Sequence, residues 1–125
     1  MPLRQTKLIE VREVPEKGRG VFARCRIPGG TEIERVPVLV IPESEIWYSS
    51  LADYVFDWTD GTVGLALGYG SIYNHSYQPN ACYADVDGHV KTFIAIRDIE
   101  AGEEITTNYN ADPEARTPVG FDVID

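Results

Sequence analysis

Short apolar runs, each bounded by glycine or proline, recur along most of this chain. Residues 6–14 alternate in part between apolar and polar side chains, and residues 31–41 form a longer run rich in valine and isoleucine. Runs of this kind, with turn signals about every 8–12 residues, are typical of strands, so the pattern predicts a mostly β fold. The expected strands are residues 6–14, 20–24, 31–41, 83–86, 90–96 and 104–108.

Four interruptions modify this β pattern. Pro37 falls inside the longest run, and because proline cannot donate to a ladder it predicts an edge position or a break there. Residues 51–58 place apolar side chains at i, i+3, i+4 and i+7, which favours one or two helical turns. The glycines within 62–72 imply close backbone approaches rather than a regular helix. Asp87-Gly88 is a two-residue hairpin signal between two apolar runs.

Length and charge narrow the possible functions. The 125 residues are enough for one compact domain, and no apolar run approaches the roughly 20 residues of a membrane span. The N-terminus shows no signal-peptide core, so cytoplasmic residence is the expectation. A formal net charge of −9 argues against direct binding of nucleic acid, which needs a basic face. The same charge suits a cationic ligand or peptide, although on charge alone an acidic surface that only maintains solubility is the favoured interpretation.

The cysteines and histidines form no metal-binding pattern. Cys25 and Cys82 lie far apart, and so do His75 and His89, without a CxxC or similar pair. Two thiols are favoured over a disulfide in a cytosolic chain. We therefore expect no structural zinc and no other metal.

Three polar segments carry candidate chemistry. The first, residues 17–23, has two glycines flanking one residue, which lets bare backbone approach a ligand; a simple turn is the plainer interpretation. The second, residues 72–81, is dense in hydrogen-bonding side chains, and its plainer interpretation is a satisfied polar turn with a buried neutral histidine. The third, residues 102–109, ends an alternating strand on a tyrosine that would ordinarily be a packing residue.

The order of these segments is more informative than any one of them. GxG, then NHSxxPN, then GEEITxxY resembles the motif series of SET-domain methyltransferases, from Gly18 to Tyr109. The resemblance is greatest to minimal single-domain viral and bacterial members, which share stretches like residues 53–56 and 66–76. It implies a SET fold: mostly β, with several small curved sheets, short helices or 3-10 turns and a C-terminal pseudoknot. Residues 1–125 would form one SET domain, with core motifs in 18–109 and a tail, 110–125, as a possible cover of the active site.

The resemblance also implies roles for individual residues. The family's catalytic tyrosine falls on Tyr109. The residues expected to bind S-adenosylmethionine are Lys17, Gly18, Arg19, Gly20, Asn74, His75 (through its backbone) and Tyr109. Those expected to line the channel for the substrate lysine are Tyr54, Tyr83 and Tyr109. The crossing of the pseudoknot is expected from Asn80, Glu103 and Glu104.

The implied methyl transfer requires few ionisable catalytic groups. Methyl transfer from a sulfonium to an amine develops no oxyanion, so alignment and exclusion of water are the main demands. The lysine must lose its proton, and acidic neighbours would oppose that, so neither Glu103 nor Glu104 is assigned as a base. Tyr109 is expected to position and polarise. A hydroxyl at Tyr83 is expected to hold a water molecule and favour low methylation states.

Three features depart from larger members of the family. No cysteine-rich segment follows Tyr109, so the tail around Pro118, Val119 and Phe121, or a partner subunit, must close the channel, and a homodimer is expected. No clear YxG motif occurs within 31–41. The last strand ends in Thr-Asn-Tyr rather than Phe-Asp-Tyr.

The function expected from the sequence is methylation of lysine in a basic protein, such as a histone or histone-like chromatin tail, with S-adenosylmethionine as cofactor. The principal alternative is a catalytically inactive SET domain that binds S-adenosylmethionine or a peptide. A third interpretation is a small β-rich interaction domain. A viral or secreted source would move the expected location from the cytoplasm to a host nucleus.

Overall fold

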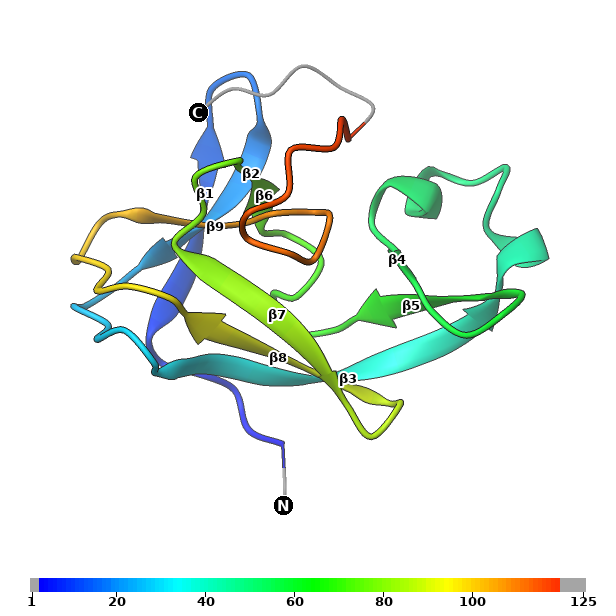
Figure 1. Ribbon diagram of the computed structural model, residues 1–125, viewed down its shortest axis with the longest axis horizontal. Coiled ribbons are helices and arrows are strands. Elements are labelled where there is room, and N and C mark those ends of the chain that lie inside the picture. Colours follow the sequence, from blue (N-terminus) through cyan, green and yellow to red (C-terminus); the bar gives the residue numbers. More distant parts are fainter. Residues whose placement is uncertain (1–2, 120–125) are drawn as a thin grey trace.

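Two curved β-sheets dominate the computed structural model, which describes residues 3–119 (Figure 1). The first sheet has the order β1 (Ile9–Val14), β2 (Gly18–Ala23), β9 (Glu104–Thr107), β6 (Asn74–His75). The second has the order β4 (Phe56–Asp57), β5 (Thr62–Ala66), β3 (Glu32–Pro42), β8 (Val90–Ala95), β7 (Ala81–Val86). Two 3-10 helices, η1 (Glu43–Glu45) and η2 (Ser50–Asp53), complete the described elements. The prediction of a mostly β fold with small curved sheets is confirmed.

The helical prediction for residues 51–58 is wrong in its second half. One 3-10 turn, η2, ends at Asp53, and the chain then extends into the short strand β4. The apolar stripe fails as a helix because Leu51 and Tyr54 are exposed and have no core to cover. Trp58 packs instead on Gly64, where an added Cβ would lie 2.6 Å from the indole ring.

Pro37 marks the point where the longest strand changes partners. Residues 32–37 of β3 pair with β8, whereas 38–42 pair with β5. The proline nitrogen, which carries no hydrogen, thus lies where the pairing with β8 ends and the pairing with β5 begins. Val38 N donates to His89 O at 2.7 Å on one side, and Leu67 N donates to Pro37 O at 3.0 Å on the other. The predicted break is therefore a change of ladder inside a continuous strand.

The core is formed by the inward-facing residues of both sheets. Its centre includes Phe93, which is stacked on Tyr73 with 4.4 Å between ring centroids. Burial of these apolar side chains is the main favourable term in the stability of a domain of this size. The buried cluster is Ile9, Val21, Ala23, Ile27, Ile33, Val36, Val38, Ala66, Tyr73, Ala81, Phe93, Ala95, Ile99 and Ile105.

The last strand joins segments that are far apart in the sequence. β9 pairs antiparallel with β2 through Val21 and Ile105, and parallel with β6 through residues 74–75 and 106–107. Figure 1 shows β9 passing between these two elements. The arrangement is consistent with the C-terminal crossing that the family resemblance implies, and it brings the second and third polar motifs into contact.

The described residues contain no metal-ligand cluster and no membrane-spanning helix. Within residues 3–119, no group of three or more His, Cys, Asp and Glu side chains is placed to hold a metal ion. Cys25 is an exposed thiol and Cys82 a half-buried one. No helix in this part of the chain has the length and hydropathy to cross a membrane.

Candidate active site

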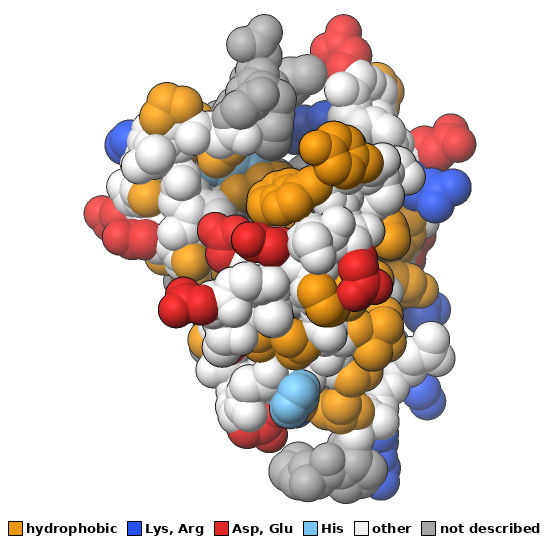
Figure 2. Space-filling view, turned by 90° about the vertical axis from the view of Figure 1, so that its right-hand side faces the viewer, with side chains coloured by type: hydrophobic (Ala, Val, Ile, Leu, Met, Phe, Trp, Pro, Cys, Tyr) orange, Lys and Arg blue, Asp and Glu red, His pale blue; other side chains and the backbone are white. Residues whose placement is uncertain are grey.

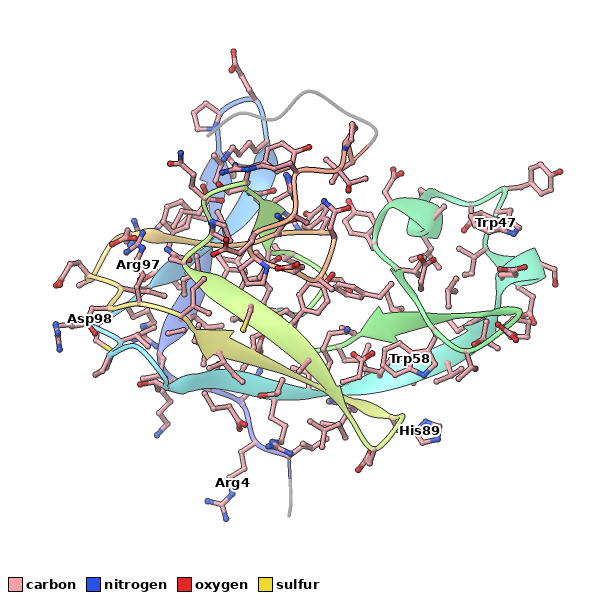
Figure 3. All side chains as sticks on the ribbon, viewed as in Figure 1. Arg4, Trp47, Trp58, His89, Arg97 and Asp98 are labelled. Carbon is pink, nitrogen blue, oxygen red and sulfur yellow. The ribbon has the colours of Figure 1, made fainter. Side chains whose placement is uncertain are left out.

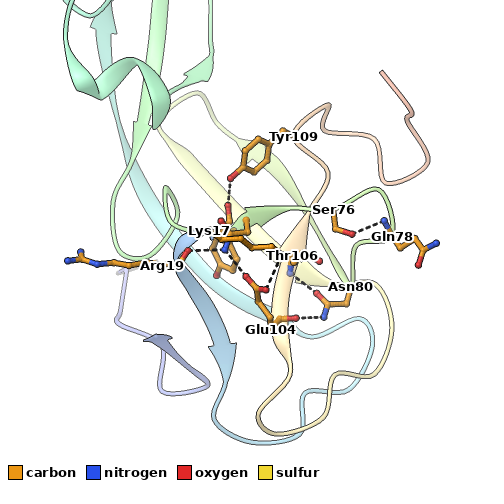
Figure 4. Close-up of polar contacts among 10 residues, drawn as sticks. Lys17, Arg19, Ser76, Gln78, Asn80, Glu104, Thr106 and Tyr109 are labelled. Carbon is orange, nitrogen blue, oxygen red and sulfur yellow. Dashed lines mark hydrogen bonds and ion pairs between the residues drawn. The ribbon is translucent and has the colours of Figure 1, made fainter. Parts of the chain in front are cut away.

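Tyr109 lies directly after β9, at the centre of the polar motifs. Its backbone N–H donates to His75 Nδ1 at 2.9 Å, and its hydroxyl donates to the backbone oxygen of Tyr73 at 2.6 Å. Tyr109 is therefore held through both its backbone and its hydroxyl by residues of the 72–81 motif, and Figure 4 shows the hydroxyl bond. An accepting Nδ1 carries no proton, so the His75 ring serves Tyr109 as a neutral acceptor on this side.

Hydroxyl groups of the site are donors rather than bases near neutral pH. Burial raises the pKa of Tyr109 to about 12, with Tyr83, Glu104 and Tyr54 acting in the same direction. Burial likewise raises the pKa of Tyr83 to about 12, and the carboxylate of Asp85 adds to that shift. The Tyr83 hydroxyl donates to the backbone oxygen of Tyr109 at 3.2 Å. Both phenols can polarise or position a neighbouring group, but neither is a phenolate that takes up a proton.

The GxG motif is tied to the second and third motifs by one polar network. Asn74 Nδ2 donates to Arg19 O at 2.8 Å and to Glu104 Oε2 at 2.7 Å. The other carboxylate oxygen of Glu104 lies 3.5 Å from Lys17 Nζ. A side chain at Gly20 would displace this network, because an added Cβ would lie 2.5 Å from Glu104 Oε2 and 2.9 Å from Asn74 Nδ2. The Asn74 amide thus holds the backbone of the GxG loop in place.

Asn80 fastens the crossing of the last strand. Its Nδ2 donates to Glu104 O at 2.8 Å and to Glu103 Oε2 at 3.1 Å, while its Oδ1 accepts from Thr106 N at 2.9 Å (Figure 4). The side chain is only 2% exposed, so these bonds replace water that the amide has lost. The structure thus brings the three predicted knot residues, Asn80, Glu103 and Glu104, into contact.

Two cavities meet at the tyrosine. The first, of about 480 Å³, contains Tyr83, Tyr73 and Lys91 in its wall. The second, of about 510 Å³, has residues 17–19 and Asn74 in its wall. Both cavities share the residues Asp53, Tyr54, Ser71 and Tyr109.

Most of the predicted site residues come together around these cavities. Lys17, Gly18, Arg19, Asn74 and Tyr109 line the second cavity, and Tyr54, Tyr83 and Tyr109 line the first. Two of the predicted site residues, Gly20 and His75, are not among the residues that line either cavity. Gly20 is buried in the network just described, and the side chain of His75 is buried and bonded to the backbone of Tyr109.

The sequence prediction missed three residues of this region. Tyr73 supplies the carbonyl that accepts the Tyr109 hydroxyl, and its own hydroxyl donates to the buried carboxylate of Glu34 at 2.7 Å. Burial raises the pKa of Glu34, although hydrogen bonds from Tyr73 and Tyr69 act against it. Lys91 lies in the first cavity. The available signal was a charged residue at an inward-facing position of an alternating strand, which holds for Glu34 and for Lys91.

The tail after Tyr109 packs against the loop that follows β6. Asn108 Nδ2 donates to Ala115 O at 2.8 Å, and the Tyr77 hydroxyl donates to Thr117 O at 3.1 Å. Asn110 and Ala111 line the first cavity, so the start of the tail contributes to the site. Of the predicted cover residues, Pro118 and Val119 are described and Phe121 lies outside the described residues.

Comparison with protein families decides the identity of this arrangement. The SET domain model matches residues 18–110, the span that contains all three motifs. The chain belongs to the SET-domain family. This confirms the family predicted from the order of the motifs.

Related proteins agree with this assignment. A Schizosaccharomyces pombe protein named "Histone-lysine N-methyltransferase, H3 lysine-37 specific" is 38% identical over 106 residues, covering 81% of this chain and 72% of its own. The "Histone-lysine N-methyltransferase set5" of the same organism is 29% identical, covering 84% of this chain and 43% of its own. The crystal structure of a proposed histone methyltransferase from Plasmodium falciparum superposes with a TM-score of 0.71 at 29% identity, covering 86% of this chain and 95% of that one.

Proposed function

We propose that this chain transfers the methyl group of S-adenosylmethionine to the ε-amine of a lysine in a basic protein, a histone or a histone-like chromatin tail. Membership in the SET family and the 38% identical relative named a histone-lysine N-methyltransferase both support a lysine methyltransferase. The cofactor, the substrate and the roles of single residues are the parts of the proposal that rest on the geometry of the site.

The observation that carries the proposal is the shared wall between the two cavities. A methyl transferase of this type must bring a donor and an amine to one point from separate sides while excluding water. Tyr109, Tyr54 and Ser71 belong to both cavities, so a group bound in one would meet a group bound in the other at these side chains.

The second cavity fits the amino-acid end of S-adenosylmethionine, which is a zwitterion. Its wall offers the Lys17 ammonium for a carboxylate and the Asp53 carboxylate for an ammonium. Gly18 has φ +83°, and a Cβ added there would meet nothing within 4 Å, so the backbone of this loop is open to a ligand. When bound, S-adenosylmethionine would supply an electrophilic methyl group on a positively charged sulfur.

The chain's own residues would align the amine and keep the site dry. Tyr109 donates to the Tyr73 carbonyl, so its ring is fixed as a wall between the two cavities. With a pKa of about 12, the Tyr109 hydroxyl keeps its proton at neutral pH and cannot act as the base. The lysine must therefore enter as the neutral amine or lose its proton to water, and burial in the cavity favours the neutral form.

The middle of the chain has an acidic composition. Residues 36–90 contain seven acidic side chains and no lysine or arginine, although the whole chain has 11 basic residues. Figure 2 shows hydrophobic side chains gathered on the face that carries β4, β5 and the 3-10 helices, with acidic side chains beside them. The exposed aromatic and aliphatic residues in and around the 3-10 helices are Trp47, Tyr48, Leu51 and Tyr54. A lysine- and arginine-rich peptide would find both charge complementarity and cation–π partners there.

The test is transfer of labelled methyl groups from S-adenosylmethionine to core histones, with modified lysines identified by mass spectrometry. We expect Tyr109→Phe to lower the turnover number by about 100-fold or more, because the ring loses the bond that fixes it. S-Adenosylmethionine should still raise the melting temperature of that variant. A wild-type protein that shows the thermal shift but transfers no methyl group would favour the inactive, cofactor-binding alternative.

The proposal also includes a homodimer, and residence in the cytoplasm or, for a viral or secreted protein, in a host nucleus. Light scattering measures the oligomeric state, and cell fractionation measures the location of the protein.

A further inference from the structure

Lys91 is a buried cation in the middle of the second sheet. It lies on β8, where it pairs with Asp85 of β7 and Val36 of β3, and it is only 1% exposed. Its Nζ donates to Asp85 Oδ1 at 2.6 Å. Lysine is almost never this buried unless its charge is compensated, so its surroundings require an explanation.

Three aromatic rings surround the ammonium of Lys91. Its Nζ lies 4.2 Å from the ring centroid of Phe56, 4.4 Å from that of Tyr83 and 5.2 Å from that of Trp58. These rings come from two distant parts of the chain, residues 56–58 and Tyr83, and Phe56 and Tyr83 also contact each other edge to face. Trp58 lies against the ladder of β5 and β3 (Figure 3) and is fixed by a 3.0 Å bond from its Nε1 to Gly88 O.

This cluster has the composition of an aromatic cage for ammonium groups. Several rings around one point, with a carboxylate at the edge, form the type of site that binds quaternary ammonium and methylated lysine. Here a lysine of the chain itself occupies the site. Burial lowers the pKa of Lys91, while the hydrogen bond and charge of Asp85 act in the opposite direction.

The cage opens onto the cavity proposed to receive the substrate lysine. Phe56, Tyr83, Asp85 and Lys91 all line that cavity together with Tyr109. The significance of this position rests on the proposed function. An empty cage beside the reacting amine would hold a protonated lysine, which has no lone pair for methyl transfer, or a methylated lysine that should leave.

We propose that Lys91 is the resident cation of this cage and keeps protonated and methylated lysine out of it. Its ammonium neutralises Asp85 and fills the space between the rings, so the cavity offers an incoming amine no rival cation site. Lys91 is thus a specificity-determining residue: it favours the neutral amine as the bound form and promotes release of the methylated product.

The proposal can be tested without the methyl-transfer reaction. The probe is the tetramethylammonium ion, added as its chloride to the full chain without cofactor and followed by ligand-observed NMR. Lys91→Ala removes both the ammonium and the side chain that fills the space between the rings, and we expect this variant to bind the probe about tenfold or more tightly than the wild type. Lys91→Arg keeps the charge and is the matched control, which should bind the probe as weakly as the wild type.

A second substitution identifies the binding site. Adding Phe56→Ala to Lys91→Ala should remove the gained binding, because one ring of the cage is lost. Equal binding of the probe by wild type and Lys91→Ala would overturn the proposal, whether or not the protein methylates histones. If Lys91→Ala does not fold, Lys91→Ser takes its place in the same comparison.

The accessibility of Lys91 can also be measured on the wild-type protein, without any substitution. The chain has three lysines, Lys7, Lys17 and Lys91. Reductive methylation with formaldehyde and a borohydride should modify Lys7 and Lys17 well before Lys91, as read by mass spectrometry of peptides. Equal modification of Lys91 would show that its ammonium is not held in the cage and would overturn the proposal.

Discussion

The polar centre of the molecule and its acidic outer lobe differ in how firmly their side chains are held. In the polar centre, around β6 and β9, Asn80 and the Tyr109 hydroxyl and N–H each have short hydrogen bonds to fixed partners. In the outer lobe, residues 43–60, the longest regular element is four residues, and Tyr48 is 103% exposed.

This difference separates two tasks. A transfer reaction needs reacting groups aligned to fractions of an ångström, which requires side chains that have one conformation each. Recognition of a flexible peptide needs an accessible surface of matching charge, which exposed carboxylates and aromatic rings provide. Substitutions in the centre should therefore affect stability and turnover, whereas substitutions in the lobe should affect substrate binding.

The largest effect on stability is expected from Asn80→Ala. Three hydrogen bonds of a buried amide are lost, and Thr106 N and Glu104 O lose their partner. At about 1 kcal/mol net for each bond, with a further penalty for buried groups left unpaired, we expect about 2–4 kcal/mol less stability. Urea denaturation followed by circular dichroism measures this.

Gln78→Ala is the matched control for that substitution. Gln78 lies two residues away in the same loop and its side chain is exposed. Its loss should change the free energy of unfolding by no more than about 0.5 kcal/mol. Equal effects of the two substitutions would show that the loop, and not the Asn80 amide, determines stability.

The lobe is tested by removing its charge without changing its shape. Glu45→Gln and Asp60→Asn together should raise KM for a histone tail about three- to tenfold and leave kcat near the wild-type value, because exposed charges contribute only about 0.2–1 kcal/mol each. The rise should disappear at high salt, where such charges are screened. A lower kcat with unchanged KM would contradict the division between centre and lobe.

The burial of Glu34 in the polar centre can be tested by the pH dependence of the free energy of unfolding. Burial raises the pKa of its carboxyl in the folded protein, so its contribution to stability is fully present below the unfolded pKa and is lost as pH rises through the folded value. Glu34→Gln should therefore flatten the decline in unfolding free energy from acidic toward neutral pH.

Glu32→Gln is the opposite-sign control for this measurement. The hydrogen bond from Arg35 lowers the pKa of the Glu32 carboxyl, so its contribution is present above the unfolded pKa and is lost as pH falls. The two variants should thus change the pH dependence in opposite directions. Urea midpoints measured from pH 4 to 8 decide the matter, and parallel curves for both variants would contradict the assignment for Glu34.

The smallest structural effect is expected from Tyr83→Phe. One long hydrogen bond to the Tyr109 carbonyl is lost, at a cost of about 0.5–1.5 kcal/mol. Its chemical effect should be clear nevertheless, because loss of the hydroxyl removes the group expected to hold a water molecule against a methylated amine. Mass spectrometry should then find more di- and trimethyllysine; identical product states would refute this role.

The sequence predicted what its local patterns encode. The strands followed from alternation and turn residues, and Pro37 correctly indicated an irregular point in β3. The motif order identified the family because the spacing of the polar segments is itself distinctive. The helical turns at 54–58 were predicted wrongly, since an apolar stripe forms a helix only where the fold offers it a core.

What the sequence could not provide were contacts between distant segments. Nothing in the 72–81 motif states that the His75 side chain would accept from the backbone of Tyr109 rather than remain a packing histidine. Likewise, Lys91 shows no sign in the sequence of meeting rings from residues 56, 58 and 83. Such relations arise from the crossing of strands, which a local pattern does not contain.

The position of β9 between β2 and β6 has a consequence for how the protein is made. On the ribosome, residues 9–23 emerge early and must wait for residues 104–107 before their sheet is complete. Pairing across such a long stretch of chain is slow, and the exposed edge of β2 is open to association with other chains in the meantime. The two cavities that share Tyr109 can therefore form only after this residue has been made, and a nascent chain that stops short of it lacks their common wall.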